Sequence, residues 1–213
     1  MTNPSISGRL IGGATSPPTR HEESATRAQP LVRVDQLHAG YDRPVVGPLS
    51  FEVAQGDVVG VRGPNGVGKS TLLRAIVGAA RIFAGQVVLQ PGVRIAYQQQ
   101  STLPLNHVPL SGRELLALTG ADPNGLPPWI SPLIGRRLDR LSGGQLQFLQ
   151  IWACLKAPVS LILLDEPTNN VDPPGVRFLE EEIARLRADH ALMVVSHDNA
   201  FLDAICTRSL QLG

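Results

Sequence analysis

A glycine-rich run at residues 63–71 constrains the fold of this chain more than any other feature. It fits the pattern G-x-x-x-x-G-K-[ST] and lies between an apolar stretch, residues 57–61, and a helix-like stretch, residues 71–77. Glycines let the backbone curl so that its N–H groups point at a phosphate, and the helix that follows adds the positive end of its dipole. The predicted nucleoside triphosphate site consists of Gly63, Pro64, Asn65, Gly66, Val67, Gly68, Lys69, Ser70 and Thr71.

Two side chains of this run have specific expected roles. Lys69 is expected to reach the β- and γ-phosphates, and the Ser70 hydroxyl is expected to ligate Mg²⁺. The alternative is a glycine-rich turn that matches the pattern by accident. The strand before the run and the helix after it favour the phosphate loop.

Length and charge exclude several classes of protein. The 213 residues are enough for one domain with room for a subdomain. A net charge of +1 gives no long-range attraction to nucleic acid, so no nucleic-acid partner is expected. No apolar run approaches the roughly 20 residues that span a bilayer. Cys154 and Cys206 lack close-spaced partners and are interpreted as buried thiols of a reducing compartment. Residues 1–30, rich in Gly, Ser, Thr, Pro and Arg, are predicted to be a disordered tail.

The first half of the chain contains four candidate strands. Residues 31–37 and 49–53 alternate apolar with polar side chains, as half-buried antiparallel strands do. Residues 85–89 and 93–97 are interpreted in the same way, with a Pro-Gly turn between them. These stretches predict an antiparallel side sheet.

The second half indicates a parallel sheet covered by helices. Residues 161–164 form a continuous apolar run, which is typical of a parallel strand buried on both faces. A helix is expected from Asp172 to about Arg187, then a strand at 191–195, a helix at 199–205 and a strand at 209–212. The predicted class is α/β: a P-loop NTPase core with a parallel sheet, an antiparallel side sheet and a short helical subdomain.

The helical subdomain is assigned to an insert at about residues 101–157, whose first part is proline-rich and irregular. One helix is predicted in this insert. It begins at a capping box formed by Ser111 and Glu114 and ends at Gly120.

Two carboxylates end the buried strand. At the carboxyl end of a parallel strand they face the crevice where ligands bind. Asp165 is expected to hold Mg²⁺, and Glu166 to act as general base on the attacking water. The structural alternative is that a buried strand simply ends in acidic residues as it reaches the surface. Residues 164–166 alone do not favour either interpretation.

A second anion site is predicted where Ser142 and Gln145 form another capping box. Gly143 and Gly144 then lie in the first turn of a helix, where two glycines are unfavourable unless something approaches the backbone closely. Because the chain already has a phosphate loop, this helix N-terminus suggests a phosphate that is bound by another subunit.

Three further residues are candidates. His197 could contact the γ-phosphate, although a lone histidine is more often a satisfied polar residue. Gln100 could bind Mg²⁺ or its water, and Tyr41 could stack on a base. The structural alternatives are a glutamine-rich loop for Gln100 and an aromatic residue on the rim of the side sheet for Tyr41.

Over residues 31–213 the chain resembles the ATP-binding subunits of ABC transporters. The resemblance is carried by six short strings that occur in the order this family uses: GPNGVGKST, YQQQ, LSGGQ, LILLDEP, NNVD and SHD. The resemblance implies ATP and Mg²⁺ as cofactors and a head-to-tail homodimer, with each ATP between the phosphate loop of one copy and the Ser142–Gly144 segment of the other. It adds Asp172, in a loop that communicates between the two sites, to the nucleotide-binding residues. Glu166 matches the catalytic base, His197 the residue that holds the γ-phosphate and water, and Gln100 the catalytic switch that senses the γ-phosphate.

The resemblance also implies partners and a location: transmembrane permease subunits, an extracytoplasmic solute-binding protein, and peripheral attachment to the cytoplasmic face of the membrane. The helical insert would carry the groove for the permease. Residues 94–105 are similar to the branch that takes up zinc or manganese.

The chain departs from the family pattern at one helix. Phe148 and Ala153 stand where the family usually has arginines, with Trp152 beside them. A soluble ABC-type ATPase acting on ribosomes or DNA is the second hypothesis; such proteins usually carry tandem cassettes or long coiled-coil insertions. A nucleotide-binding clamp without turnover is the third, and Glu166 and His197 argue against it.

Overall fold

The computed structural model describes residues 29–99 and 109–213. The predicted tail lies almost wholly outside these ranges, as do Gln100 and the start of the expected insert. Within the described residues, no helix has the length and apolar character needed to cross a membrane.

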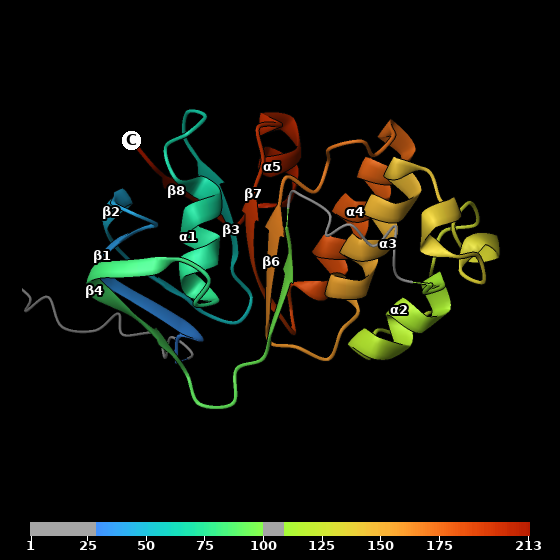
Figure 1. Cartoon of the computed structure of the whole chain (residues 1–213), viewed down its shortest axis with the longest axis horizontal. Helices are drawn as coiled ribbons and strands as arrows, with labels where there is room; N and C mark the ends of the chain where they lie inside the picture. The colour runs from blue at the N-terminus through green and yellow to red at the C-terminus, as the bar shows by residue number, and fades with distance from the viewer. Residues whose placement is uncertain (1–28, 100–108) are drawn as a thin grey trace, which may run out of the picture.

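A five-stranded parallel sheet forms the centre of the molecule (Figure 1). Its strand order is β5–β6–β7–β3–β8. The strands are β3 (Val58–Arg62), β5 (Ile95–Gln98), β6 (Leu161–Asp165), β7 (Ala191–Val195) and β8 (Arg208–Gln211).

A three-stranded antiparallel sheet lies to one side of it, in the order β2–β1–β4. Its strands are β1 (Val32–Gly40), β2 (Pro44–Val53) and β4 (Arg81–Leu89). Helix α1 (Lys69–Ile76) packs against all three of these strands and also touches β6 and β7, so it joins the two sheets (Figure 1).

The expected strand at residues 93–97 was placed in the wrong sheet. The structure has β5 at the edge of the parallel sheet, running parallel to β6 with Tyr97 opposite Leu163. An edge strand is incompletely covered, and the first three residues of β5 are only half-buried. Partial burial gives an edge strand the same mixed pattern as a half-exposed antiparallel strand, so the sequence pattern did not separate the two cases.

Helices cover the other face of the parallel sheet. They are α3 (Gly143–Leu155), α4 (Pro173–Leu186) and α5 (Asn199–Ile205), with α2 (Gly112–Thr119) at the periphery beside α3 (Figure 1). Two short 3₁₀ turns, Ser131–Leu133 and Leu138–Arg140, connect α2 to α3.

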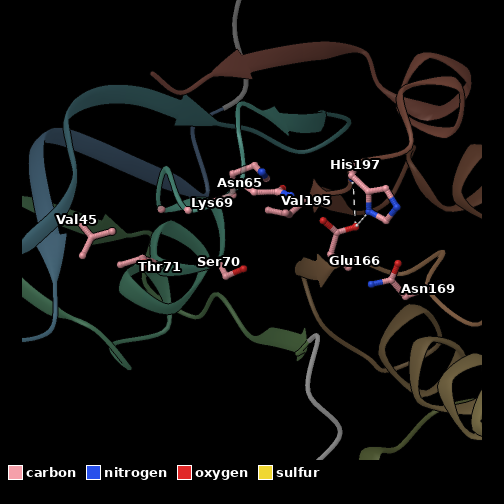
Figure 2. Close-up of a pocket in the computed structure, with 11 residues that line it drawn as sticks. Val45, Asn65, Lys69, Ser70, Thr71, Glu166, Asn169, Val195 and His197 are labelled. Carbon is pink, nitrogen blue, oxygen red and sulfur yellow. Dashed lines mark hydrogen bonds and ion pairs between the residues drawn. The ribbon is translucent and has the colours of Figure 1, made fainter.

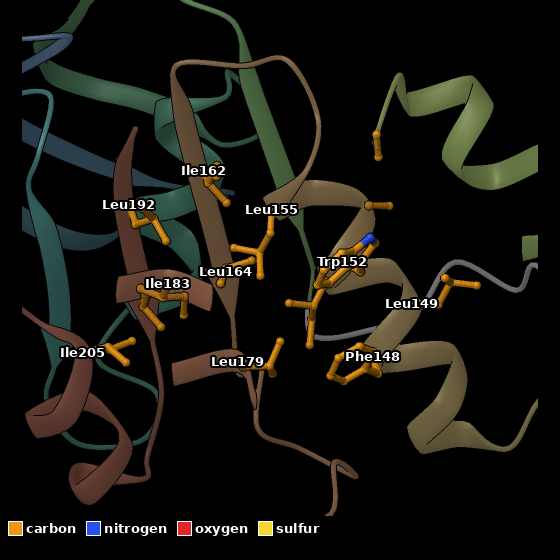
Figure 3. Packing of buried hydrophobic residues seen from close by; sticks show 14 of the residues in the cluster. Phe148, Leu149, Trp152, Leu155, Ile162, Leu164, Leu179, Ile183, Leu192 and Ile205 are labelled. Atoms are coloured by element: carbon orange, nitrogen blue, oxygen red, sulfur yellow. The ribbon is translucent and has the colours of Figure 1, made fainter. Parts of the chain in front are cut away.

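The apolar run of β6 supplies both layers of the core. Leu161 and Leu163 pack with α1 and the antiparallel sheet, whereas Ile162 and Leu164 pack with α3 and α4 (Figure 3). Successive side chains of a strand point to opposite faces, so a strand buried on both faces must be apolar throughout. This arrangement holds the polar end of β6, at Asp165, between the two layers.

Local capping signals set the starts of α2, α3 and α4. Both expected capping boxes are present: Ser111 with Glu114 at the start of α2, and Ser142 with Gln145 at the start of α3. Asp172 caps α4, and its Oδ1 accepts from the Gly175 N–H at 3.0 Å. A side chain that accepts from a first-turn N–H fixes where a helix begins.

Candidate active site

The glycine-rich run connects the end of β3 to the start of α1, as expected. Gly63 has a φ of 148°, and a Cβ at this position would lie 2.5 Å from the carbonyl oxygen of Leu212. Only glycine fits such a conformation and such a close approach. The loop then delivers the first N–H groups of α1, which lack intrahelical acceptors, to the cavity beside it.

The Lys69 ammonium lies over the loop itself. Its Nζ donates to the carbonyl oxygens of Gly63 at 2.8 Å and Pro64 at 3.0 Å, and the residue is only 8% exposed. An ammonium carries three donors and no acceptor, and the two carbonyl oxygens hold its charge beside the loop. This placement provides a positive charge next to N–H groups that point outward.

Asp165 and Ser70 meet at the end of β6. The Ser70 hydroxyl donates to Asp165 Oδ1 at 2.9 Å, and Asp165 is buried. Burial raises the pKa of the Asp165 carboxyl, the Ser70 hydrogen bond opposes that rise, and the nearby charge of Glu166 adds to it. A buried carboxylate disfavoured in this way gains from a nearby cation.

Glu166 follows immediately and is held from two directions. Its N–H donates to the Val195 carbonyl at 2.8 Å with φ at 56°, a left-handed conformation uncommon for a side-chain-bearing residue. Its Oε2 accepts from the His197 N–H at 3.2 Å and lies 2.8 Å from His197 Nδ1. The carboxylate is therefore fixed beside the imidazole, at the end of its strand.

A cavity of about 470 Å³ brings Lys69, Ser70, Glu166 and His197 together, whereas Asp165 is not among its lining residues (Figure 2). Figure 2 shows Lys69 and Ser70 on one side, with Glu166 and His197 on the other. Three lining residues, Val45, Asn169 and Val195, were not found as site residues from the sequence, because only the fold brings them next to the loop. The cavity is lined by Val45, Asn65, Gly66, Gly68, Lys69, Ser70, Thr71, Glu166, Asn169, Val195 and His197.

Tyr41 is not among the residues that line this cavity. Its side chain is 46% exposed, and its hydroxyl accepts from Arg74 Nη1 at 2.7 Å. The structure thus leaves the Tyr41 ring accessible, and a role in stacking stays a prediction.

A second cavity, of about 350 Å³, lies at the start of α3. The Ser142 hydroxyl accepts from the Gln145 N–H at 3.3 Å, while the Gln145 side chain accepts from the Ser142 N–H at 3.0 Å. Ser142, Gly144, Gln145 and Asp172 all line this cavity, so four of the predicted site residues are grouped there, apart from the phosphate loop.

The two glycines of α3 have different surroundings. A Cβ on Gly144 would lie 2.2 Å from the carbonyl oxygen of Asn170, whereas a Cβ on Gly143 would meet nothing within 4 Å. The close approach expected from the sequence is therefore present at Gly144 and comes from the chain itself. Gly143 leaves open space beside the helix N-terminus.

The side chain at position 148 belongs to an aromatic cluster under this second cavity. Phe148 is 2% exposed, and its ring centroid lies 6.2 Å from Trp129, 6.0 Å from Phe178 and 6.5 Å from Trp152. The Trp152 indole N–H donates to the Asp122 carbonyl at 3.0 Å, so its polar atom is satisfied. Aromatic packing thus occupies the place where the resemblance led us to expect an arginine.

Protein side chains alone do not form a transition-metal site in the described parts of the chain. In residues 29–99 and 109–213 there is no group of three or more His, Cys, Asp or Glu residues that could hold a metal ion. The pair of Ser70 and Asp165 instead offers one hydroxyl and one carboxylate oxygen. Such a pair suits Mg²⁺, which takes few protein ligands and completes its shell with phosphate and water oxygens.

A parallel sheet with a phosphate loop at its carboxyl end, a buried aspartate and a glutamate next to a histidine defines the class of P-loop ATPases. The ABC transporter family matches residues 46–169. The zinc import ATP-binding protein ZnuC of Marinobacter nauticus is 37% identical over 196 residues, which cover 86% of this chain and 75% of that protein.

Two other similarities mark the breadth of this family. The energy-dependent translational throttle protein EttA of Mycobacterium tuberculosis is 35% identical over 84% of this chain but only 34% of its own length. The solved structure of an ATP-binding subunit of an ABC transporter superposes with a TM-score of 0.72 at 23% identity, covering 85% of each chain. The chain belongs to the ABC transporter family, as an ATP-binding and ATP-hydrolysing subunit.

Proposed function

We propose that this chain hydrolyses ATP at a seam between two of its own copies and thereby drives zinc uptake through separate permease subunits. The observation that carries the proposal is the division of the predicted site into two cavities of one chain. The first gathers the phosphate loop with Glu166 and His197, and the second gathers Ser142 and Gln145.

Within the first cavity we assign the phosphates to the loop residues and Lys69. The Lys69 Nζ has only to leave the carbonyls of Gly63 and Pro64 to reach a phosphate oxygen. Loop N–H groups and the first turn of α1 supply further donors. Residues 63–71 then hold the nucleotide without help from a second chain.

Ser70 and Asp165 are the residues we assign to Mg²⁺. They are already 2.9 Å apart, and burial disfavours the charged form of Asp165 as long as no cation balances it. When bound, the ion neutralises charge that develops on the transferred phosphoryl group. Gln100, outside the described residues, is the further ligand and switch that the family resemblance suggests.

Glu166 is assigned as general base and His197 as the residue that keeps it in place. The hydrogen bonds of His197 to Glu166 Oε2 leave Oε1 of that carboxylate for a water molecule. A general base positioned in this way contributes about 10²- to 10⁴-fold to a rate.

The second cavity would complete the site of a partner copy. Ser142, Gly143, Gly144 and Gln145 present a capped helix N-terminus, and Asp172 is grouped with them. We propose that this surface contacts the γ-phosphate held by the other copy's loop, with Asn170 to Asp172 at the seam between the two copies.

The experiment that tests this proposal is Glu166→Gln. Hydrolysis should fall by about 10²- to 10⁴-fold, while ATP and Mg²⁺ should convert the protein into a dimer detectable by size-exclusion chromatography with light scattering. Glu181→Gln, at a carboxylate with 64% exposure, is the matched control and should leave both properties unchanged. A Glu166→Gln variant that hydrolyses ATP at the parent rate, or that stays monomeric with ATP, would contradict the assignment.

Zinc is proposed as the transported ion because several curated relatives named zinc import ATP-binding proteins are 34–37% identical over most of the chain. The partners would be a permease and an extracytoplasmic solute-binding protein, at the cytoplasmic face of the membrane. A deletion strain should grow poorly under zinc limitation and recover with added zinc. Rescue by manganese alone would move the assignment to that ion.

We further propose that residues 31–213 form the ATP-binding domain, with a helical insert at about 101–157, and that residues 1–30 are a tail. A soluble ABC-type ATPase is the second candidate function, favoured by the 35% identity to EttA over 84% of this chain. This chain covers 34% of that relative, and its net charge of +1 gives no strong attraction to RNA. Recovery of the tagged protein with ribosomes rather than with a membrane protein would favour this second function.

A further inference from the structure

Arg74 lies between two tyrosines from separate parts of the fold. Its Nη1 donates to the hydroxyl of Tyr41 at 2.7 Å, just beyond the end of β1. The side chain of Tyr97 on β5 lies near the same guanidinium, and interactions with both tyrosines raise the pKa of Arg74. A guanidinium has five donors in a rigid fork, so it can serve two hydroxyls at once.

Tyr97 in turn faces Asp165. Its hydroxyl lies 3.5 Å from Asp165 Oδ2, while the Ser70 hydroxyl lies 2.9 Å from Oδ1. Each oxygen of this buried carboxylate thus accepts a hydrogen bond from a hydroxyl on a different element. Both hydrogen bonds stabilise the charged carboxylate against the cost of its burial.

Packing accounts for the ring of Tyr97 but not for its hydroxyl group. It packs with the core layer beside α1 and lines an apolar groove with Ile95, Val87 and Leu89. A phenylalanine would fill the same space. The hydroxyl is the part of the side chain that packing leaves unexplained, and it points to the carboxylate assigned to Mg²⁺.

We propose that Tyr97 is a positioning residue that orients Asp165 for the magnesium ion, and that Arg74 links it to Tyr41, so that base binding and ion binding are energetically coupled. The proposal rests on the Mg²⁺ role proposed for Asp165 and on the predicted stacking of Tyr41 on a base. When Tyr41 moves onto a base it strains or breaks its bond to Arg74, which alters how Arg74 holds Tyr97. Such coupling between two ligands is reciprocal.

The test measures ion binding without turnover. In a Glu166→Gln background with ATP bound, Mn²⁺ replaces Mg²⁺ as a paramagnetic probe and its affinity is read by electron paramagnetic resonance. Tyr97→Phe removes one hydrogen bond to the carboxylate and should weaken Mn²⁺ binding by about 3- to 10-fold. Thr119→Val, which removes a hydroxyl bonded only within α2, is the matched control and should change nothing.

A double-mutant cycle tests the link through Arg74. Tyr41→Phe keeps the ring for stacking but loses the hydroxyl, and it should weaken Mn²⁺ binding by about 2-fold. In the Tyr97→Phe background, Tyr41→Phe should weaken Mn²⁺ binding by less than it does in the protein that keeps Tyr97. The reason is that Tyr97→Phe has already removed the link from Arg74 to Asp165. Independent effects that multiply fully, or an unchanged affinity in Tyr97→Phe, would overturn the proposal.

Two further variants separate the possible failures. Asp165→Asn should weaken Mn²⁺ binding more than any tyrosine change; if it does not, the proposed role of Asp165 fails with this inference. If only Asp165→Asn has an effect, the role of Asp165 stands and the inference alone fails. Should Tyr97→Phe not fold, Arg74→Met tests the link with the tyrosine ring in place, and it should abolish the effect of Tyr41→Phe.

Discussion

The cavity beside the phosphate loop and the cavity beside Ser142 are lined by different chemistry. The first contains an ammonium, hydroxyls, a carboxylate and an imidazole. The second, within the described residues, contains no cation; it pairs a capped helix N-terminus and the carboxylate of Asp172 with an apolar wall of Trp129 and Phe148. The first cavity has what is needed to hold a triphosphate, whereas the second offers neutral donors and a carboxylate.

The two cavities are also formed by different secondary-structure elements. The first cavity stands on the ends of parallel strands buried on both faces, and the second stands on helices and an aromatic cluster. Substitutions in the two regions should therefore fail in different ways: loss of nucleotide binding on one side, and loss of turnover or of local packing on the other.

The largest effect is expected from Phe148→Arg, which restores a common family residue to a site built for an aromatic ring. Phe148 is 2% exposed among three aromatic residues, so an unpaired guanidinium should cost about 3–5 kcal/mol of unfolding free energy. Urea denaturation measures the loss, with Phe148→Leu as a milder control. An equally stable arginine variant would show that this wall differs less from the family pattern than its packing indicates.

The next effect separates binding from turnover. Lys69→Met removes the one ammonium that lines the first cavity, among the described residues, and should weaken ATP binding to the single chain by about 100-fold, measured by calorimetry. Ser142→Ala should leave that affinity within about 2-fold and instead lower hydrolysis by about 10-fold or more.

Ser142 also caps α3, so its control must lose a cap without touching the cavity. Ser111→Ala removes the matching capping box of α2 and should cost about 1 kcal/mol with hydrolysis retained. Equal losses of ATP affinity in the Lys69 and Ser142 variants would erase the functional distinction between the two cavities.

A smaller effect is expected within the second cavity. Gly144→Ala forces a methyl group against the Asn170 carbonyl and should destabilise the protein by about 1–3 kcal/mol. Gly143→Ala meets open space and should stabilise the isolated chain by up to about 1 kcal/mol, because alanine favours the helix. Thermal unfolding of both variants measures the difference, and the same sign in both would contradict the geometry.

The smallest effect concerns the two thiols, one in each region. Burial raises the pKa of Cys206, beside β3, to about 11 and that of Cys154, in α3, to about 12. Because a raised thiol pKa disfavours the reactive thiolate, alkylation by iodoacetamide at pH 8 should be slow and should accelerate as the pH rises toward these values. Cys206 should react up to about 10-fold faster than Cys154, as peptide mapping would show; faster labelling of Cys154 would indicate that the helical region opens first.

Much of this structure could be predicted because its signals are local. The phosphate loop, the caps at Ser111, Ser142 and Asp172, and the apolar run of β6 each depend on a few neighbouring residues. The physical reason is that hydrogen bonds in a first turn, and burial on both faces of a strand, act within one element.

Other features depend on contacts distant in the chain, and the sequence did not reveal them. The parallel pairing of β5 with β6 joins Tyr97 to Leu163, and Val45 and Asn169 reach the first cavity only through the fold. The link between Arg74 and Tyr41 spans 33 residues. No periodicity encodes such pairs, because each is set by how two separate elements pack.

The contact between Gly144 and Asn170 has a mechanical consequence. With no free space between the start of α3 and that loop, neither can shift without carrying the other, and the loop begins only four residues after Glu166, with a 3.3 Å hydrogen bond from Asn169 back to the Glu166 carbonyl. A displacement of the start of α3 would therefore reach Glu166, the proposed general base, over a very short span of backbone. In the proposed dimer, this short rigid connection would link nucleotide bound by one copy to the position of Glu166 in the other.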